Sequence, residues 1–164
     1  MLECIGAKLN IGSIENGKMS FQQKSPLEFL DTDMARKIIK SISFPKIPKS
    51  VKFQYFKVAP RNAFSLGHGG AAFMAEFDTK GTKMVKKPSF VFGGISASFH
   101  HATEAEDFIE GKDLSDKIVL EKVFSLVDKA IKDDKDDDHK KFISGSAVFK
   151  LSISVYYGKN EQFI

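Results

Sequence analysis

An apolar strand that runs into two consecutive glycines, with an acidic helix after it, is the feature that most constrains the fold. Residues 90–92 are Phe-Val-Phe and precede Gly93-Gly94, and the segment 102–112 then mixes acidic and apolar residues before closing on Gly-Lys. Thr103 and Glu106 have the spacing of a capping box, which predicts that they cap this helix. A glycine pair inside a strand indicates a close approach of other groups to the backbone. The segment therefore predicts a strand, a close backbone approach and a short helix.

A β-hairpin is predicted near the N-terminus. Asn16-Gly17 separates residues 9–14 from residues 18–21, and both flanking segments contain apolar residues. Asn-Gly tolerates the positive φ angles that a type I′ turn requires, so it is the strongest short-range signal for a two-residue hairpin loop.

A short helix and a strand are predicted next. Ser25 and Glu28 have capping-box spacing, and proline occupies the first helical position between them. These signals predict a helix near residues 26–30. The segment 38–44 is rich in β-branched residues and ends before a proline, which favours a strand.

Three further strands are predicted in the middle of the chain. Residues 51–58 alternate, with Val51, Phe53 and Tyr55 on the face that we expect to be buried. A strand over 71–78 follows. The last strand is expected from residue 89, directly after Pro88, to residue 100, with the glycine pair interrupting it.

The order of elements predicts an α+β fold. Helices are expected at about 103–110 and 115–132, with Asp113 or Ser115 capping the second and an apolar stripe along it that includes Phe124. We expect an antiparallel β-sheet with both helices packed on one face. A charged loop over 133–138 and a mixed segment over 142–157 complete the chain.

Composition excludes several classes of protein. Cys4 is the only cysteine, so neither an internal disulfide nor a thiolate metal cluster can form, and a cytoplasmic location is the simplest expectation. No apolar segment approaches the roughly 20 residues of a transmembrane helix. The start of the chain lacks the basic and apolar regions of a signal peptide. We also expect no metal site, because His139 stands where a calcium loop built on Asp134, Asp136 and Asp138 would need glycine.

The predicted segments, in this order, resemble the C-terminal portion of the FAD-binding domain of the molybdenum–flavin oxidoreductases, the aldehyde oxidase and xanthine dehydrogenase family. Residues 38–45 resemble the strand that ends the family's FAD-binding lobe, and residues 53–61 resemble the Lys-x-x-x-Arg strand that opens the next lobe. The strand, glycine pair and helix closing on Gly111-Lys112 follow as they do in the family. Asn62-Ala63, after the arginine, is more similar to aldehyde oxidases than to xanthine dehydrogenases.

Two cofactor-binding residues are implied by this resemblance. In the family, an apolar residue on the first of these strands packs against the flavin, and Ile39 occupies that place. A lysine twelve positions after the proline that ends the strand contacts the cofactor, and Lys57 matches it when counted from Pro45. The resemblance implies that Ile39 and Lys57 lie close together and face one groove. No catalytic side chain is expected, because FAD would carry the chemistry.

The resemblance also implies a domain division and partners. Residues 1–47 would be the end of the FAD-binding lobe, and residues 48–164 would be the C-terminal lobe of the flavin domain. The family's glycine-rich phosphate loop, iron–sulfur cysteines and molybdenum domain have no counterpart in these 164 residues. The chain would then be a fragment of an aldehyde oxidase-like enzyme, covering the flavin that passes electrons to oxygen or NAD. The remaining domains would be its partners, in an enzyme that is itself a homodimer.

An alternative from a different class is a non-enzymatic binding or assembly protein. Residues 1–102 carry 15 basic and 7 acidic residues, and the segment 34–75 contains eight basic residues and no acidic one. A positive surface of this kind suits an anionic partner, of which nucleic acid is the main candidate. Binding of labelled DNA or RNA that weakens steeply with salt would mark this alternative.

Overall fold

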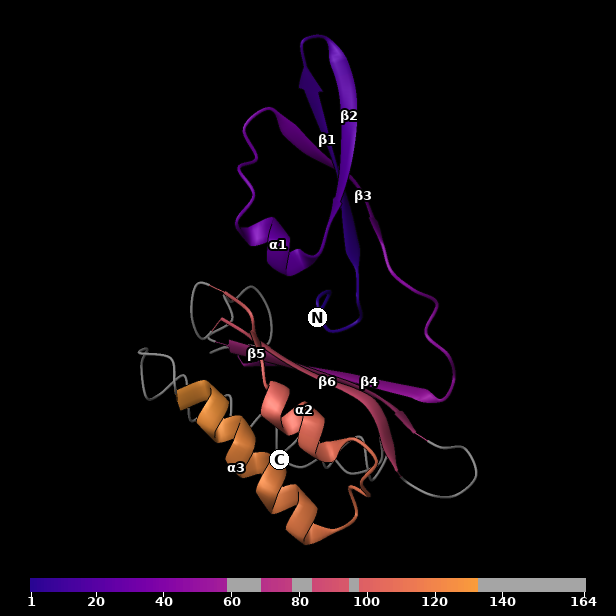
Figure 1. Ribbon diagram of the computed structural model, residues 1–164, viewed down its shortest axis with the longest axis vertical. Coiled ribbons are helices and arrows are strands. Elements are labelled where there is room, and N and C mark those ends of the chain that lie inside the picture. The colour runs from indigo at the N-terminus through magenta and orange to yellow at the C-terminus, as the bar shows by residue number, and fades with distance from the viewer. Residues whose placement is uncertain (59–68, 78–83, 95–97, 133–164) are drawn as a thin grey trace. The chain divides into compact units, whose positions relative to one another are not determined.

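The computed structural model describes residues 1–58, 69–77, 84–94 and 98–132 (Figure 1). The chain forms two compact units, Met1–Ile47 and Pro48–Ile164. The expectations for residues 133–138 and 142–157 lie outside the described residues.

The first unit contains a three-stranded antiparallel sheet in the order β2-β1-β3. Strands β1 (Lys8–Glu15) and β2 (Lys18–Lys24) form the predicted hairpin, since Glu15 pairs with Lys18 across a two-residue loop. Asn16 and Gly17 both have positive φ angles, 50° and 73°, as a type I′ turn requires. Strand β3 (Lys37–Ser43) pairs with the other edge of β1, which confirms the strand expected there.

Helix α1 (Pro26–Leu30) begins with the predicted capping box. The Glu28 backbone N–H donates to the Ser25 hydroxyl at 3.1 Å, and the Ser25 N–H donates to the Glu28 carboxylate at 2.7 Å. The two hydrogen bonds satisfy two donors that a helix start otherwise leaves without partners. The pKa of Glu28 lies below its ordinary value of 4.5, chiefly because the carboxylate accepts a hydrogen bond from the Ser25 backbone N–H, with the Ser25 side chain as the second cause.

Removing the Ser25 hydroxyl is expected to weaken this unit. Ser25→Ala should lower the free energy of unfolding by about 1 kcal/mol, the usual effect of losing an N-cap side chain. The lowered pKa of Glu28 means that its carboxylate stabilises the fold above the ordinary value and ceases to do so as pH falls through the lowered one. Urea unfolding of both proteins from about pH 7 to about pH 3 checks these effects. Equal stabilities at neutral pH would contradict the prediction.

The second unit is built on a four-stranded antiparallel sheet in the order β4-β5-β6-β7. Its strands are β4 (Val51–Val58), β5 (Gly69–Phe77), β6 (Val85–Gly93) and β7 (His100–His101). Helices α2 (Thr103–Ile109) and α3 (Lys117–Lys132) lie on one side of it (Figure 1). The expected α+β fold is therefore confirmed, with its strands divided between two sheets.

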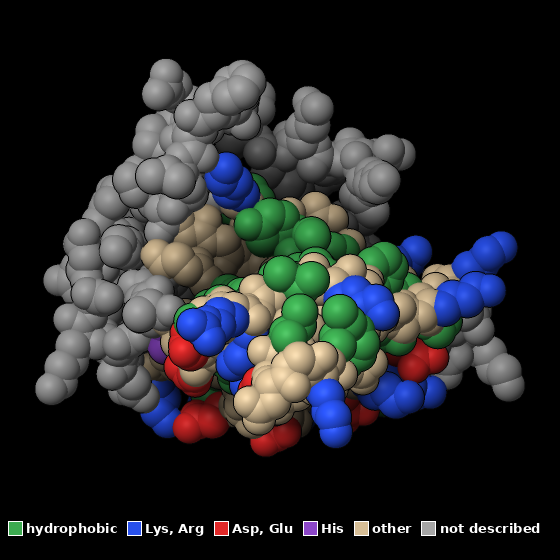
Figure 2. Space-filling view, turned by 90° about the horizontal axis from the view of Figure 1, so that it is seen from above, with side chains coloured by type: hydrophobic (Ala, Val, Ile, Leu, Met, Phe, Trp, Pro, Cys, Tyr) green, Lys and Arg blue, Asp and Glu red, His purple; other side chains and the backbone are tan. Residues whose placement is uncertain are grey.

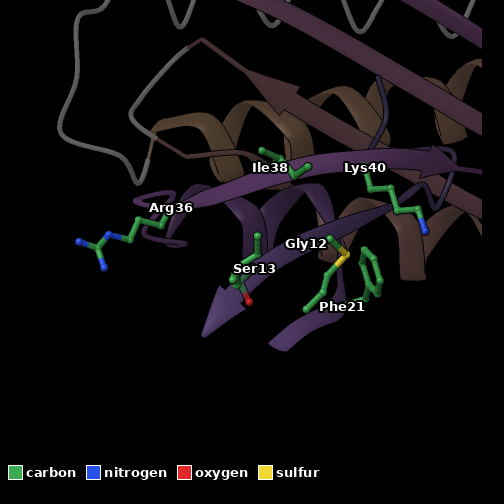
Figure 3. Close-up of a pocket in the computed structure, with 8 residues that line it drawn as sticks. Gly12, Ser13, Phe21, Arg36, Ile38 and Lys40 are labelled. Carbon is green, nitrogen blue, oxygen red and sulfur yellow. The ribbon is translucent and has the colours of Figure 1, made fainter. Parts of the chain in front are cut away.

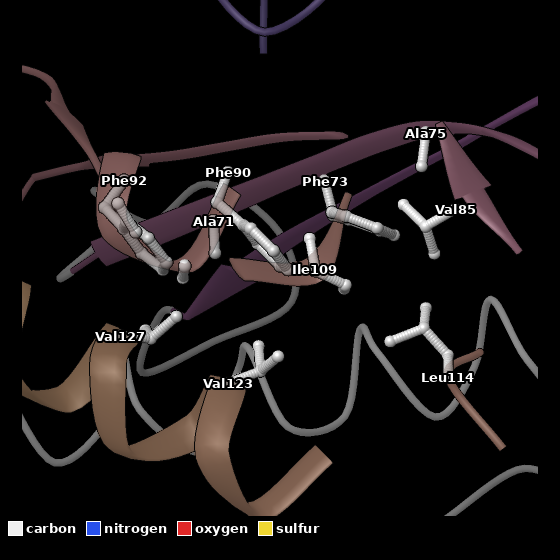
Figure 4. Packing of buried hydrophobic residues seen from close by; sticks show 12 residues of the cluster. Ala71, Phe73, Ala75, Val85, Phe90, Phe92, Ile109, Leu114, Val123 and Val127 are labelled. Atoms are coloured by element: carbon white, nitrogen blue, oxygen red, sulfur yellow. The ribbon is translucent and has the colours of Figure 1, made fainter. Parts of the chain in front are cut away.

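The hydrophobic core of this unit lies between the sheet and the two helices (Figure 4). Phe73 on β5 and Phe90 on β6 are paired in the sheet, and their rings stack with centroids 4.4 Å apart. Ala105 and Ile109 from α2 are fully buried against them. The other buried members come from β5, β6, α3 and the segments that flank the helices: Ala71, Ala75, Val85, Phe92, Ala102, Leu114, Val123 and Val127.

The buried face of β4 differs from the expectation. Phe56 packs against the core, whereas the Tyr55 side chain is 43% exposed. Because antiparallel partners share a face, Phe56 lies on the helix side with its partner Ala71, and Tyr55 lies on the other side with Ala72. The apolar residues at 51, 53 and 55 therefore do not mark the helix-covered face. Phe124 of α3, expected on the buried stripe, is likewise 40% exposed.

The caps of α2 and α3, unlike that of α1, were predicted incorrectly. The N-cap of α2 is Ala102, and its side chain makes no capping hydrogen bond. Glu106 instead accepts a 2.6 Å hydrogen bond from the backbone N–H of Phe90 in β6. For α3, the residue before the first turn is Asp116, and its carboxylate accepts from the Ile118 N–H at 2.8 Å.

Strand β6 begins earlier than expected, so that Pro88 lies inside it. The pairing with β5 shifts between Met74 and Glu76, and Lys87 in the shifted region has a φ angle of 48°. This is a β-bulge, one of the few places where a sheet tolerates proline, because the ladder there lacks a regular donor. The Lys87 N–H donates to the Glu110 carboxylate at 2.7 Å, which ties the bulge to the end of α2.

Candidate functional site

Lys57 lies on the face of the four-stranded sheet that the helices leave uncovered. It is opposite Gly70 on β5, and Gly70 is in turn opposite Gly93 on β6. The Lys57 side chain is exposed. Lys57 therefore begins a row across three strands in which the next two positions have no side chain.

Two aromatic rings lie over these glycines. A Cβ atom on Gly70 would be 3.0 Å from the Tyr55 hydroxyl oxygen, and one on Gly93 would be 3.1 Å from Cδ1 of Phe99. Both distances are shorter than ordinary van der Waals contacts, so a larger residue at either glycine would displace a ring. Sequence reasoning did not find this arrangement, because it depends on the register between β4, β5 and β6.

Ile39 lies on β3 in the first unit. It is paired with Ile11 of β1, which is 3% exposed, whereas Ile39 itself is 42% exposed. The residue thus presents part of an apolar side chain to the surface. Ile39 and Lys57 belong to different compact units. That they face one groove stays a prediction.

A pocket of about 280 Å³ lies on the face of the three-stranded sheet opposite to Ile39 (Figure 3). Gly12 forms part of it, and a Cβ atom there would be 3.2 Å from the Phe21 ring. Arg36 and Lys40 lie at its two ends, and the Lys40 Nζ is 4.2 Å from the Phe21 ring centroid. The remaining residues that line it are Ser13, Ile14, Met19 and Ile38.

Several of the apolar side chains that line this pocket are exposed to solvent. Ile14, Met19, Phe21 and Ile38 are between 49% and 66% exposed. A contiguous exposed apolar patch marks a contact surface or promotes association. In a space-filling view, hydrophobic side chains are visible at the surface with Lys and Arg side chains among them (Figure 2).

We therefore expect the isolated chain to self-associate or to bind a hydrophobic dye. Ile38→Ser should reduce dye fluorescence and shift the chain toward monomer, because it removes the most exposed member of the patch. Ile118→Ser on α3 is the matched control, since that residue is 75% exposed but does not line the pocket. Dye titration and analytical ultracentrifugation make the comparison. A monomer that binds no dye would contradict the expectation.

Other kinds of site receive no support from the described residues. Among them, no group of three or more His, Cys, Asp or Glu side chains is arranged to hold a metal ion. Within the same part of the chain, no helix is both long and apolar enough to cross a membrane.

The sequence matches the family model of the CO dehydrogenase flavoprotein C-terminal domain over residues 54–143, more than half of the chain. The chain therefore belongs to this family of flavoprotein domains. The expected relation to the flavin domain of the molybdenum–flavin oxidoreductases is confirmed, and the nucleic-acid-binding alternative is not favoured.

Solved structures of the same class have a similar fold. CO dehydrogenase from Oligotropha carboxidovorans is similar with a TM-score of 0.70 and 14% identity, covering 96% of this chain and 55% of that one. Quinoline 2-oxidoreductase from Pseudomonas putida 86 gives a TM-score of 0.67 and 19% identity, over 95% of this chain and 55% of that one. Carbon monoxide dehydrogenase from Hydrogenophaga pseudoflava, in a form that lacks the Mo-pyranopterin moiety of the molybdenum cofactor, gives a TM-score of 0.66 and 13% identity. This match covers 91% of this chain and 52% of that one.

The chain thus spans about half the length of these structural relatives. No curated protein sequence matches it significantly.

A flavin cofactor is implied by the family, and the residues present suit it. Lys57 offers an exposed ammonium group, which fits an anionic or electron-rich part of FAD. Ile39 offers exposed apolar surface, which fits the flat ring system. Because Gly70 and Gly93 have no Cβ atom, the rings of Tyr55 and Phe99 can pack directly against the backbone of the sheet beside Lys57.

Proposed function

We propose that this chain forms the C-terminal part of the FAD domain in an aldehyde oxidase-like molybdenum hydroxylase. Its role is to cover the flavin that passes electrons to oxygen or NAD. The match to the flavoprotein C-terminal domain over residues 54–143 is the observation that carries the proposal. The similar folds of the molybdenum CO dehydrogenases support it.

The proposed flavin contacts are Ile39 and Lys57. Ile39 packs against the ring system and shields it from water, while the ammonium group of Lys57 binds an anionic or electron-rich group of the cofactor. When bound, FAD supplies the electron-transfer chemistry, and the chain holds the cofactor in place. Residues 1–47 belong to the FAD-binding lobe in this proposal, and residues 48–164 form the C-terminal lobe.

The remaining domains of the enzyme are the proposed partners. They carry the glycine-rich phosphate loop, the iron–sulfur clusters and the molybdenum cofactor, and the whole enzyme is a cytoplasmic homodimer. A single buried cysteine, Cys4, agrees with a reducing compartment. Coding sequence for a cysteine-rich domain and a molybdenum domain beside the gene would support this assembly.

Lys57→Ala in the complete enzyme tests the proposed cofactor contact. We expect about tenfold weaker retention of FAD, the size of effect that follows from losing one charge-assisted contact. The fold should be nearly unchanged, because the side chain is exposed. FAD titration of the stripped enzyme, with circular dichroism as the structural measurement, checks both points.

The matched control is Lys52→Ala, which removes an exposed lysine from the same strand at a position of opposite parity. It should leave FAD retention unchanged. Equal FAD affinity in Lys57→Ala and the unaltered enzyme would overturn the proposed role of Lys57. A double-cysteine variant at residues 39 and 57 tests the shared groove, since a short thiol cross-linker should join the two positions.

A further inference from the structure

The pocket of about 280 Å³ on the three-stranded sheet has an apolar floor that draws on all three strands. Gly12 of β1 pairs with Phe21 of β2 on one side and with Ile38 of β3 on the other. Two positions further along β1, Ile14 pairs with Met19. Paired residues share a face of a sheet, and so do residues two positions apart on a strand, so these side chains lie on one side. All four of them remain exposed, which leaves the floor open to a ligand.

Two cations lie at the ends of this floor, Arg36 at one end and Lys40 at the other (Figure 3). None of the described residues that line the pocket is acidic. The pairing of β3 with β1 skips Lys40, which makes it the extra residue of a β-bulge, a feature that redirects a side chain. Arg36 has a φ angle of 57°, and backbone strain of this kind is concentrated at ligand-binding positions. Both cations therefore occupy special backbone positions.

A second pocket, of about 360 Å³, adjoins the Arg36 end of the first. The two pockets share Ser13, Ile14 and Arg36. The second is more polar, and its two cations, Arg36 and Lys37, outnumber its one carboxylate, Glu15. Small-molecule sites commonly have volumes of about 300–1,000 Å³, so the joined pockets are large enough for such a ligand. An apolar floor that leads to a polar end with excess positive charge is complementary to a molecule with an apolar body and an anionic head group.

We propose that the two pockets form a binding site for a medium-chain aliphatic carboxylate, with its chain on the apolar floor and its head group at Arg36. The planar guanidinium group binds a carboxylate through two parallel hydrogen bonds. Arg36 and Lys40 are four positions apart, roughly 13 Å along an extended backbone, which is the length of a chain of about ten carbons. The site does not depend on the proposed flavin contacts, since Ile39 lies on the opposite face of the sheet and Lys57 belongs to the other unit.

Calorimetric titration of the 164-residue chain with decanoate, octanoate and decanamide tests the ligand class. Decanamide has the same chain without the charge and should bind about tenfold more weakly than decanoate, the effect of losing one charge-assisted contact. Octanoate lacks two CH₂ groups and should also bind about tenfold more weakly, because less apolar surface is removed from water. Equal affinities for decanoate and decanamide would show an unselective apolar patch and overturn the proposal.

Arg36→Gln tests the position of the head group. It should weaken decanoate binding about tenfold and leave decanamide binding unchanged. Lys40→Gln is the matched control, because it removes a cation from the opposite end. It should change decanoate binding less than about twofold, since charges more than about 10 Å apart are largely screened. Ile38→Ser alters only the floor and should weaken both ligands alike. Thermal unfolding of each variant checks the fold. Equal losses in Arg36→Gln and Lys40→Gln would overturn the assignment of the head group to Arg36.

Other occupants of this face would give different results. Sedimentation of the chain with and without decanoate detects a second copy: a dimer that Ile38→Ser dissociates, and that decanoate neither binds nor dissociates, would overturn the ligand site. The same titration on the complete enzyme detects a covering domain. Decanoate binding by the isolated chain alone would assign the face to a contact between domains and overturn the ligand site as well. Binding by both, with the loss in Arg36→Gln, is the result that we expect.

Discussion

Phe73→Ala is expected to lower the free energy of unfolding of the second unit by about 3–5 kcal/mol, the usual range for removing a buried phenylalanine ring. Phe73 is completely buried, and its ring stacks on that of Phe90 at a centroid distance of 4.4 Å. Alanine would remove the stacking contact and leave a cavity between the sheet and the helices. Such a loss is a large fraction of the stability of an ordinary domain.

Equilibrium unfolding in guanidinium chloride, followed by circular dichroism, measures this loss. Phe124→Ala is the control, because it removes the same ring from a helix position that is 40% exposed. Its cost should be about a third as large, since the ring is only partly removed from water in the folded state. Similar losses in the two variants would contradict the assignment of Phe73 to the centre of the core.

Local signals account for the parts of the fold that the sequence predicted well. Asn16-Gly17 determines its turn through the φ angles of two adjacent residues, and the structure has positive values at both. The capping box of Ser25 and Glu28 likewise involves only residues three positions apart. Structures of this kind are independent of what packs on them, which is why they could be read from the sequence.

The buried face of β4 could not be predicted in the same way. Alternation separates Tyr55 from Phe56 but does not say which side the helices cover. That choice depends on α2 and α3, which lie far along the chain and pack on the face that includes Phe56. The arrangement of the candidate site likewise depends on contacts between residues far apart in the sequence. Ile39 and Lys57 were proposed from a family resemblance, whereas the rings over Gly70 and Gly93 depend on strand register.

The role of Glu106 was missed because its carboxylate makes a long-range hydrogen bond to β6 in place of the predicted local one at the start of α2. Strand β7 has two residues, and they pair with Val91 and Phe92. Beyond this short strand, the edge of β6 at Phe90 is satisfied by other groups. The Ala102 N–H donates to the Phe90 carbonyl at 3.2 Å, and Glu106 accepts from the Phe90 N–H. The Glu106 carboxylate thus satisfies a backbone donor of β6 and does not cap the first turn of its own helix.

Glu106→Leu is therefore expected to lower the free energy of unfolding by about 1–3 kcal/mol, because it leaves the Phe90 N–H without its acceptor in a partly buried place. Glu106→Gln should cost less, since its amide oxygen can still accept the hydrogen bond. The Glu106 carboxylate is also 3.6 Å from Nδ1 of His101, so both variants remove a carboxylate from this contact. Amide hydrogen exchange at Phe90 is the specific measurement, and it should accelerate in Glu106→Leu.

Glu104→Leu is the control on the same helix. Glu104 pairs with Lys129 of α3 at 2.9 Å, but both side chains are about 60% exposed, so the ion pair is screened by solvent. Its loss should cost less than about 1 kcal/mol and leave exchange at Phe90 unchanged. If Glu106→Leu and Glu104→Leu cost the same, and the Phe90 N–H stays equally protected in both, the carboxylate of Glu106 does not extend the ladder of β6. The hydrogen bond would then contribute nothing to the joint between α2 and the sheet.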